Sequence, residues 1–120
     1  MREKMIPRKV KSFVKRDGRM TDAQREALVR LSPQFLLKLE DGLINTREVF
    51  QREAPTNFEI GFGSGRSLLE MAKLHPEENF IGIEMHQPGI GGLLLGMELN
   101  QVDNIRIYYA DAVEAVSYTH

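Results

Sequence analysis

The chain has 120 residues, 42% of them hydrophobic, which is enough for one modest core. It contains no cysteine, and this excludes disulfide bonds and thiolate metal sites. No apolar run is long enough to span a bilayer or to form the core of a signal peptide, so a cytoplasmic protein without membrane contact is the simplest interpretation.

The net charge of −1 is unevenly distributed, because residues 1–20 form a basic N-terminal arm. Residues 1–19 hold eight Lys and Arg against Glu3 and Asp17, which gives +6 and leaves −7 for the remainder. Such an arm can follow phosphates by releasing counterions, or it can be a solvated tail. The candidate RNA contacts are Arg8, Lys9, Lys11, Lys15 and Arg16.

Residues 21–54 predict a helical connector rather than a second domain. The run Thr21-Asp22-Ala23-Gln24 is a capping box, and it predicts a helix that ends at Ser32-Pro33. From Gln34 to Ala54 apolar side chains are mixed with charges, which indicates short helical pieces.

The run from Asn57 to Arg66 predicts a strand, a glycine-rich turn and the start of a helix. Glycines at 61, 63 and 65 allow positive φ and close backbone approach, and the helix that follows offers unpaired N–H groups in its first turn. This pattern favours a nucleotide-like ligand. The alternative is a tight connection that binds nothing.

Charge distinguishes between the cofactors that such a turn could hold. A dinucleotide fingerprint would place its third glycine at position 66, where this chain has Arg66, and it needs no acid two residues before the first glycine. Glu59 would repel a pyrophosphate, but it suits the ammonium end of S-adenosylmethionine, which carries a sulfonium and no phosphate. The sequence therefore favours S-adenosylmethionine over NAD.

Two further acids follow the next two predicted strands. Glu84 ends the strand Asn79–Ile83 and lies 19 residues beyond Gly65 (84 − 65), close to the spacing of about 20 at which an acid accepts ribose hydroxyls. Asp111 follows the strand Ile105–Tyr109 and could accept from an adenine amino group. We expect Glu59, Glu84 and Asp111 at one rim of a parallel sheet, although each taken alone could be a surface acid.

The helices between these strands are predicted from their apolar faces. After the turn, Leu68, Leu69, Met71 and Ala72 fit one face of a helix. Pro88 suits the start of the next helix, whose apolar face is Ile90, Leu93, Leu94 and Met97. Glycines at 92 and 96 weaken that helix and indicate close packing.

Histidine chemistry is not expected to contribute a metal site. His86 lies near the predicted cleft, but His75 and His120 offer it no helical ligand spacing. We interpret His86 as a hydrogen-bonded structural residue and predict no metal site.

At this point the sequence resembles the bacterial tRNA (guanine-N7-)-methyltransferases, which are class I S-adenosylmethionine-dependent enzymes. The most particular match is the Glu-x-His-x-Pro-Gly run at residues 84–89. The other matching segments are 8–16, 18–21, 59–63, 66–72, 80–86, 88–91 and 111–114.

The resemblance implies an α/β, Rossmann-like fold in which residues 55–115 form the N-terminal half of the cofactor domain, with its first three strands. It implies methyl transfer from S-adenosylmethionine to N7 of a guanine in the variable loop of tRNA. The implied cofactor ligands are Glu59, Glu84 and Asp111, with backbone at Gly61, Gly63 and Ala112 nearby.

Part of the family pattern has no match in this chain. The family's catalytic aspartate stands in a Phe-Pro-Asp-Pro-Trp-like segment that is absent here, and residues 116–120 are an atypical C-terminal end. We therefore expect an N-terminal portion that is inactive alone, with an exposed sheet edge at residues 58–61 that favours self-association. A non-catalytic nucleotide- or RNA-binding module is the alternative, and an NAD-linked oxidoreductase is more distant.

Overall fold

The computed structural model describes residues 20–37 and 45–110. Helices and strands alternate along most of this length, as expected for an α/β protein. In chain order they are α2 (Asp22–Phe35), β1 (Leu36–Leu37), α3 (Thr46–Phe50), β2 (Thr56–Ile60), α4 (Arg66–Leu74), β3 (Asn79–Glu84), α5 (Gln87–Asn100) and β4 (Ile105–Tyr109).

The strands form one four-stranded sheet in the order β1-β4-β3-β2, and every pairing in it is parallel. Helix α4 connects β2 to β3, and helix α5 connects β3 to β4, so the chain builds two successive β-α-β units. The predicted Rossmann-like α/β fold is confirmed. Because the strands are parallel, the carboxyl ends of β2, β3 and β4 meet at the same edge of the sheet.

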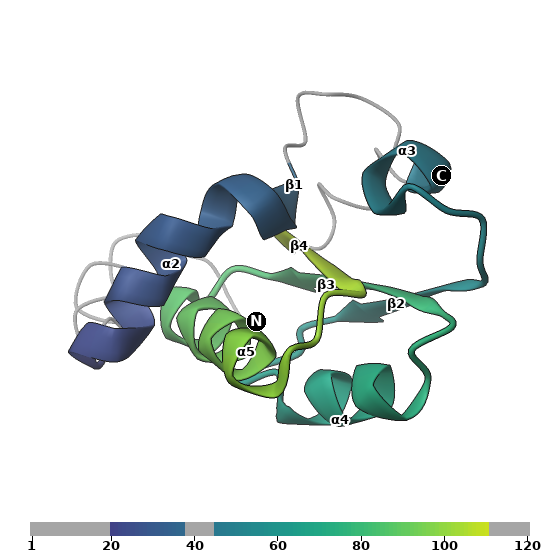
Figure 1. Ribbon diagram of the computed structural model, residues 1–120. Coiled ribbons are helices and arrows are strands. Elements are labelled where there is room, and N and C mark those ends of the chain that lie inside the picture. Colours follow the sequence, from purple (N-terminus) through teal and green to yellow (C-terminus); the bar gives the residue numbers. More distant parts are fainter. Residues whose placement is uncertain (1–19, 38–44, 111–120) are drawn as a thin grey trace.

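Helices α2, α4 and α5 cover one face of the sheet and α3 lies on the other (Figure 1), and each face carries an apolar cluster. The larger cluster joins α2, α4 and α5 to the inward side chains of β3 and β4, among them Phe80, Ile105 and Ile107. The smaller cluster contains Ile81 and Ile83 of β3, with Tyr108, and Phe50 of α3 packs against it. The apolar face predicted for α5 is confirmed, since Ile90, Leu93, Leu94 and Met97 are all buried. In α4, Leu68 and Ala72 are buried, and Met71, which flanks this apolar face, is 45% exposed.

Helix α2 begins as predicted and ends later than predicted. Thr21 Oγ1 accepts from the Gln24 amide while the Gln24 side chain accepts from the Thr21 amide, which completes the capping box. The predicted end at Ser32-Pro33 was wrong, because the helix continues through Pro33 to Phe35. The Ser32 hydroxyl donates to the carbonyl of Leu28, the Leu36 amide donates to Ser32, and Phe35 is buried. Burial of Phe35 thus stabilises a last turn that proline alone would disfavour.

Strand β1 was not predicted, and it corrects the expected count of three strands. Leu36 and Leu37 pair with Ile107 and Tyr108 of β4, so the segment interpreted as a connector supplies a fourth, outer strand. Two residues are too few to show an alternating pattern, so nothing local in the sequence could reveal this pairing. The short helix α3 agrees with the helical pieces expected between residues 34 and 54.

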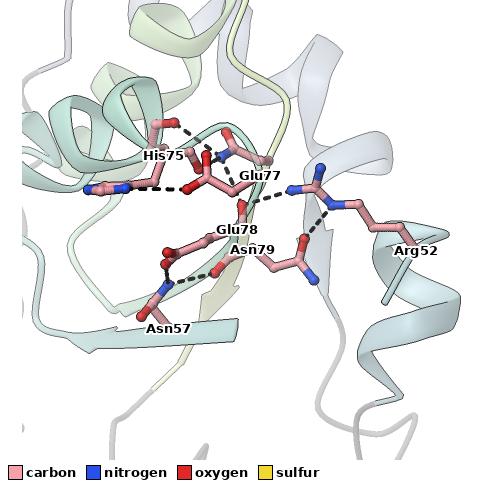
Figure 2. A network of polar contacts seen from close by, with 8 residues as sticks. Arg52, Asn57, His75, Glu77, Glu78 and Asn79 are labelled. Atoms are coloured by element: carbon pink, nitrogen blue, oxygen red, sulfur yellow. Dashed lines mark hydrogen bonds and ion pairs between the residues drawn. The ribbon is translucent and has the colours of Figure 1, made fainter. Parts of the chain in front are cut away.

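The amino end of the sheet is held by a network of amide and guanidinium groups (Figure 2). The buried Asn104 side chain donates to three carbonyls at the end of α4 and in the following turn, those of Ala72, His75 and Glu78, at 3.0–3.1 Å. Arg52 donates to Asn79 Oδ1 and to the carbonyl of Glu78, at 2.8 Å each. These contacts fix where β3 begins, at the end of the strand opposite Glu84.

Helices α2 and α5 lie side by side (Figure 1) and are linked by one arginine. Arg30 forms ion pairs of 2.6 Å with Glu26 on its own helix and with Glu98 on α5. Hydrogen bonds from Arg30 lower the pKa of Glu98 and of Glu26 below their ordinary value. Among the described helices, no helix combines the length and apolar character needed to cross a membrane.

Candidate functional site

The glycine-rich turn has the backbone conformation that its sequence predicts. Gly61, Gly63 and Gly65 have φ of 69°, 63° and 79°, values that side-chain-bearing residues rarely adopt. The Gly61 amide donates to the carbonyl of Ile83 at 2.8 Å, and the Gly65 amide donates to Phe62 at 3.0 Å. Gly65 is also the residue before the first turn of α4. The turn between β2 and α4 is therefore held by backbone hydrogen bonds, and it is exposed at Gly61, Gly63 and Ser64.

Glu84 is in direct contact with this turn. As the last residue of β3, it accepts a hydrogen bond from the Gly63 amide at its Oε1 atom, with a distance of 2.7 Å. Its Oε2 atom accepts from the amides of Met85 and His86, at 3.2 and 3.1 Å. A carboxylate has about four lone-pair positions, so Glu84, which is only half-buried, keeps acceptor capacity for a ligand.

Glu59 lies on the neighbouring strand, on the same face of the sheet as Glu84. It pairs with Gly82 of β3, and side chains two residues apart on a strand share a face. Glu59 also lines a shallow hollow with Leu68 and Met71 of α4, which places it on the α4 side. The structure thus puts two of the three predicted acids on one face of adjacent strands, diagonally related and near the carboxyl edge.

A buried phenylalanine, which sequence analysis did not single out, anchors the turn. Phe62 is only 7% exposed, although it stands between two exposed glycines. A methyl carbon at Gly82 would lie 2.6 Å from the Phe62 ring and 2.8 Å from Leu68, so Gly82 leaves the space that this ring fills. The sequence signal for this anchor was an apolar residue between two glycines. Its partner, Gly82, lies in another strand, so the contact could not be predicted from the turn alone.

Met85 and His86 continue the edge beyond Glu84. The Met85 side chain is an apolar group that is 61% exposed, which was also missed from sequence. His86 precedes α5, and its carbonyl accepts from the amides of Gly89 and Ile90. Any residue could make these backbone contacts, so the structural interpretation of the His86 side chain stays a prediction.

The remaining predicted site residues lie outside the described residues. These are Asp111 and Ala112 at the cofactor site and Arg8, Lys9, Lys11, Lys15 and Arg16 in the basic arm. The last described residue, Ala110, donates its amide to the carbonyl of Glu84 at 3.0 Å. The chain therefore leaves β4 next to Glu84.

A second group of titratable side chains lies at the opposite end of the sheet (Figure 2). One ligand atom each from His75, Glu77 and Glu78 falls within 4.8 Å of the others. His75 Nδ1 is 3.5 Å from Glu77, and Glu78 Oε1 accepts from Asn57 at 2.8 Å. These contacts give the group a structural role in the turn before β3.

A parallel α/β sheet with a positive-φ glycine turn and an acid at the next strand end defines a Rossmann-like domain of the kind that binds nucleoside cofactors. The family described as "Putative methyltransferase" matches residues 53–119, which is more than half of the chain. The chain belongs to this methyltransferase family.

Curated relatives from several bacteria are similar to nearly the whole chain. The tRNA (guanine-N(7)-)-methyltransferase of Ectopseudomonas mendocina (strain ymp) is 51% identical over 109 residues, which is 91% of this chain and 46% of the relative. Proteins with the same name from Idiomarina loihiensis and Hydrogenovibrio crunogenus are 51% and 48% identical over 91% and 92% of this chain, and 44% and 46% of the relatives. The chain thus spans less than half the length of these relatives.

Proposed function

We propose that this chain is the cofactor-binding part of a tRNA (guanine-N7-)-methyltransferase, which transfers a methyl group from S-adenosylmethionine to N7 of a variable-loop guanine. The observation that carries the proposal is the hydrogen bond between the Glu84 carboxylate and the Gly63 amide, in a chain about half identical to enzymes of that name. The cytoplasm is the proposed site of action.

The donor set of the site fits S-adenosylmethionine better than a phosphate-bearing cofactor. Glu84 is placed to accept from a ribose hydroxyl at the one lone-pair position, of about four, that its three amide contacts leave free. Glu59 supplies negative charge for the ammonium group, and the same charge would repel a pyrophosphate. Exposed backbone at Gly61 and Gly63 allows close approach of the ligand, and Met85 offers an apolar surface for adenine. Asp111 and Ala112 complete the proposed ligand set.

S-Adenosylmethionine supplies the electrophilic methyl group on its sulfonium. Because N7 of guanine carries a lone pair and no proton, the reaction needs alignment of N7 with that methyl more than a strong base. The residues of this chain contribute by fixing the orientation of the adenosyl and amino acid parts. We assign no catalytic residue to the chain.

Two partners belong to the proposal. The first is tRNA, whose phosphates would be contacted by the basic arm through Arg8, Lys9, Lys11, Lys15 and Arg16 in a salt-sensitive manner. The second is another copy of the chain, pairing along strand β2 at the edge of the described sheet.

Calorimetric titration tests the cofactor proposal. The folded chain should bind S-adenosylhomocysteine and should not bind NAD. Glu84→Ala should weaken the binding of S-adenosylhomocysteine by about tenfold or more, because a charge-assisted hydrogen bond contributes about 1.5–3 kcal/mol. Glu70→Ala, which removes an exposed acid of α4, should bind as tightly as the wild type.

The same titration can contradict the proposal. If the sample is folded by circular dichroism but binds no S-adenosylhomocysteine, the proposed function is refuted. If that sample still bound RNA, the non-catalytic RNA-binding module would be the better interpretation.

A further inference from the structure

The first turn of α5 packs directly against the glycine-rich turn. Gly89 is buried in that first turn. A methyl carbon at position 89 would lie 2.0 Å from the carbonyl oxygen of Gly63 and 3.0 Å from its carbonyl carbon. Contacts below 3.0 Å essentially never occur for a real Cβ atom, and here the obstacle is backbone. The hydrogen of Gly89 that replaces a side chain therefore faces the Gly63 carbonyl, in the manner of a Cα–H···O contact.

Gly63 is consequently held through both of its backbone polar groups. Its amide donates to Glu84 Oε1 at 2.7 Å, and its carbonyl is packed against Gly89. The contact with Glu84 comes from the end of β3, and the contact with Gly89 comes from the start of α5. These two elements are joined by only Met85 and His86. The orientation of Gly63, with φ of 63°, thus depends on how closely α5 approaches the turn.

We infer that Gly89 is a positioning residue of the proposed cofactor site: its missing side chain lets α5 hold Gly63 in the orientation in which the Gly63 amide engages Glu84. This inference rests on the proposed function for the identity of the ligand, an adenosyl compound. Gly89 acts through Gly63 and Glu84 and need not touch the ligand.

The other glycines of α5 face different surroundings, which makes them useful for comparison. A methyl carbon at Gly91 would lie 2.8 Å from the Gln24 carbonyl oxygen of α2. At Gly96 it would lie 2.9 Å from the flexible end of Leu69. At Gly92 the nearest atom, Gln24 Nε2, is 3.5 Å away, an ordinary contact. The close packing predicted at positions 92 and 96 is found at Gly96 but not at Gly92, and the close approaches to backbone are at Gly89 and Gly91, where none was predicted.

Three alanine variants separate positioning of the turn from general destabilisation. Each of Gly89→Ala, Gly91→Ala and Gly92→Ala is examined by thermal unfolding, by the ¹⁵N–¹H NMR shift of the Gly63 amide, and by titration with S-adenosylhomocysteine. Gly92→Ala should resemble the wild type in NMR shift and affinity. Gly91→Ala should unfold at a lower temperature with the Gly63 amide unmoved.

Gly89→Ala should move the Gly63 amide resonance and weaken S-adenosylhomocysteine binding by about tenfold, the effect of losing one charge-assisted hydrogen bond. If its Gly63 shift and its affinity match those of Gly92→Ala, the inference is wrong. If the wild type binds no S-adenosylhomocysteine, the proposed function is refuted. The Gly63 shift is measured without ligand, so it still decides whether Gly89 positions the turn.

If Gly89→Ala does not fold, a second variant tests the inference. Gly89→Ala is then combined with Gly92→Ala, which raises the helix propensity of α5. A folded double variant with a moved Gly63 amide would support the inference. Loss of folding in that background as well would contradict a role confined to positioning.

Discussion

Single polar side chains at the two ends of β3 determine how the sheet is organised. At the carboxyl end, the Glu84 side chain accepts hydrogen bonds from three backbone amides. Near the amino end, the Asn104 side chain donates hydrogen bonds to three backbone carbonyls. Both are side chains that satisfy backbone groups left unpaired where a helix or strand stops. The acid end is chemically suited to a ligand, whereas the amide end is closed by protein contacts.

Asn104→Ala should destabilise the fold by about 1–3 kcal/mol, because three carbonyls near the end of α4 would lose their shared donor in a buried position. Thermal unfolding followed by circular dichroism measures this loss. The matched control is Asn100→Ala, which removes one exposed hydrogen bond to Gly96 and should change stability by less than about 0.5 kcal/mol. Equal effects of the two variants would show that the Asn104 network contributes little.

For single residues, the sequence predicts the roles that depend on the local backbone conformation and charge. The glycine pattern and Glu59 could be interpreted because the conformation and charge that they need are properties of the turn itself. The packing roles of Phe62, Asn104 and Gly89 were not predicted, because they depend on atoms brought close by the fold. Gly89 looks like any helix glycine until the Gly63 carbonyl is seen beside it.

At the scale of elements, α2 is joined to the Rossmann-like core by three kinds of contact. Its apolar side chains enter the larger cluster, its backbone at Gln24 approaches Gly91, and Arg30 connects it to Glu98 of α5. The capping box made its start predictable. Its end was not, because burial of Phe35 and the pairing of β1 with β4 are tertiary effects that outweigh the local signal of Pro33.

The Arg30 cluster should give the α2–α5 contact a dependence on pH. The pKa of Glu26 and of Glu98 is lowered by hydrogen bonds from Arg30, so their contribution is complete above the unfolded-state pKa and is lost as pH falls through the lowered folded-state values. Arg30→Met should therefore lower the melting temperature near neutral pH. The difference from the wild type should shrink from about pH 5 downwards, and it should also shrink with added salt.

Melting curves of the wild type and Arg30→Met across this pH range provide the measurement. Arg25→Met is the control, since Arg25 makes a looser ion pair, of 3.7 Å, with the exposed Asp22. It should show a small difference at every pH. A gap between the wild type and Arg30→Met that stays constant down to about pH 3 would contradict the assignment.

For the whole molecule, the consequential feature is the unequal protection of the two sheet edges. The outer strands of the described sheet are β1, which is two residues long, and β2, which is five residues long and pairs with β3 alone among the described strands. Residues whose backbone groups bond to β3 alternate along β2, so Thr56, Phe58 and Ile60 turn their N–H and C=O groups outward. Phe58 and Ile60 are also 48% and 53% exposed. Such an edge invites pairing with another strand.

The chain should consequently self-associate as its concentration rises, and Ile60→Lys should reduce this association, because a lysine at an edge strand opposes pairing. Sedimentation velocity over a concentration series measures the change. Leu74→Lys places the same charge at a 70% exposed position of α4, away from the edge, and should leave association unchanged. A wild type that stays monomeric throughout would exclude this role for β2.

The start of α2 has a consequence for any RNA that the N-terminal arm holds. A methyl carbon at Gly92 would lie 3.5 Å from Gln24 Nε2 and 4.0 Å from the Ser64 carbonyl, so the first turn of α2 lies beside the glycine-rich turn. Residues 1–19, with a charge of +6, precede this first turn in the chain. Because these charges are joined covalently to the turn, under the proposed function their weak, sequence-independent attraction for phosphates would raise the local concentration of a nucleic acid near the methyl donor.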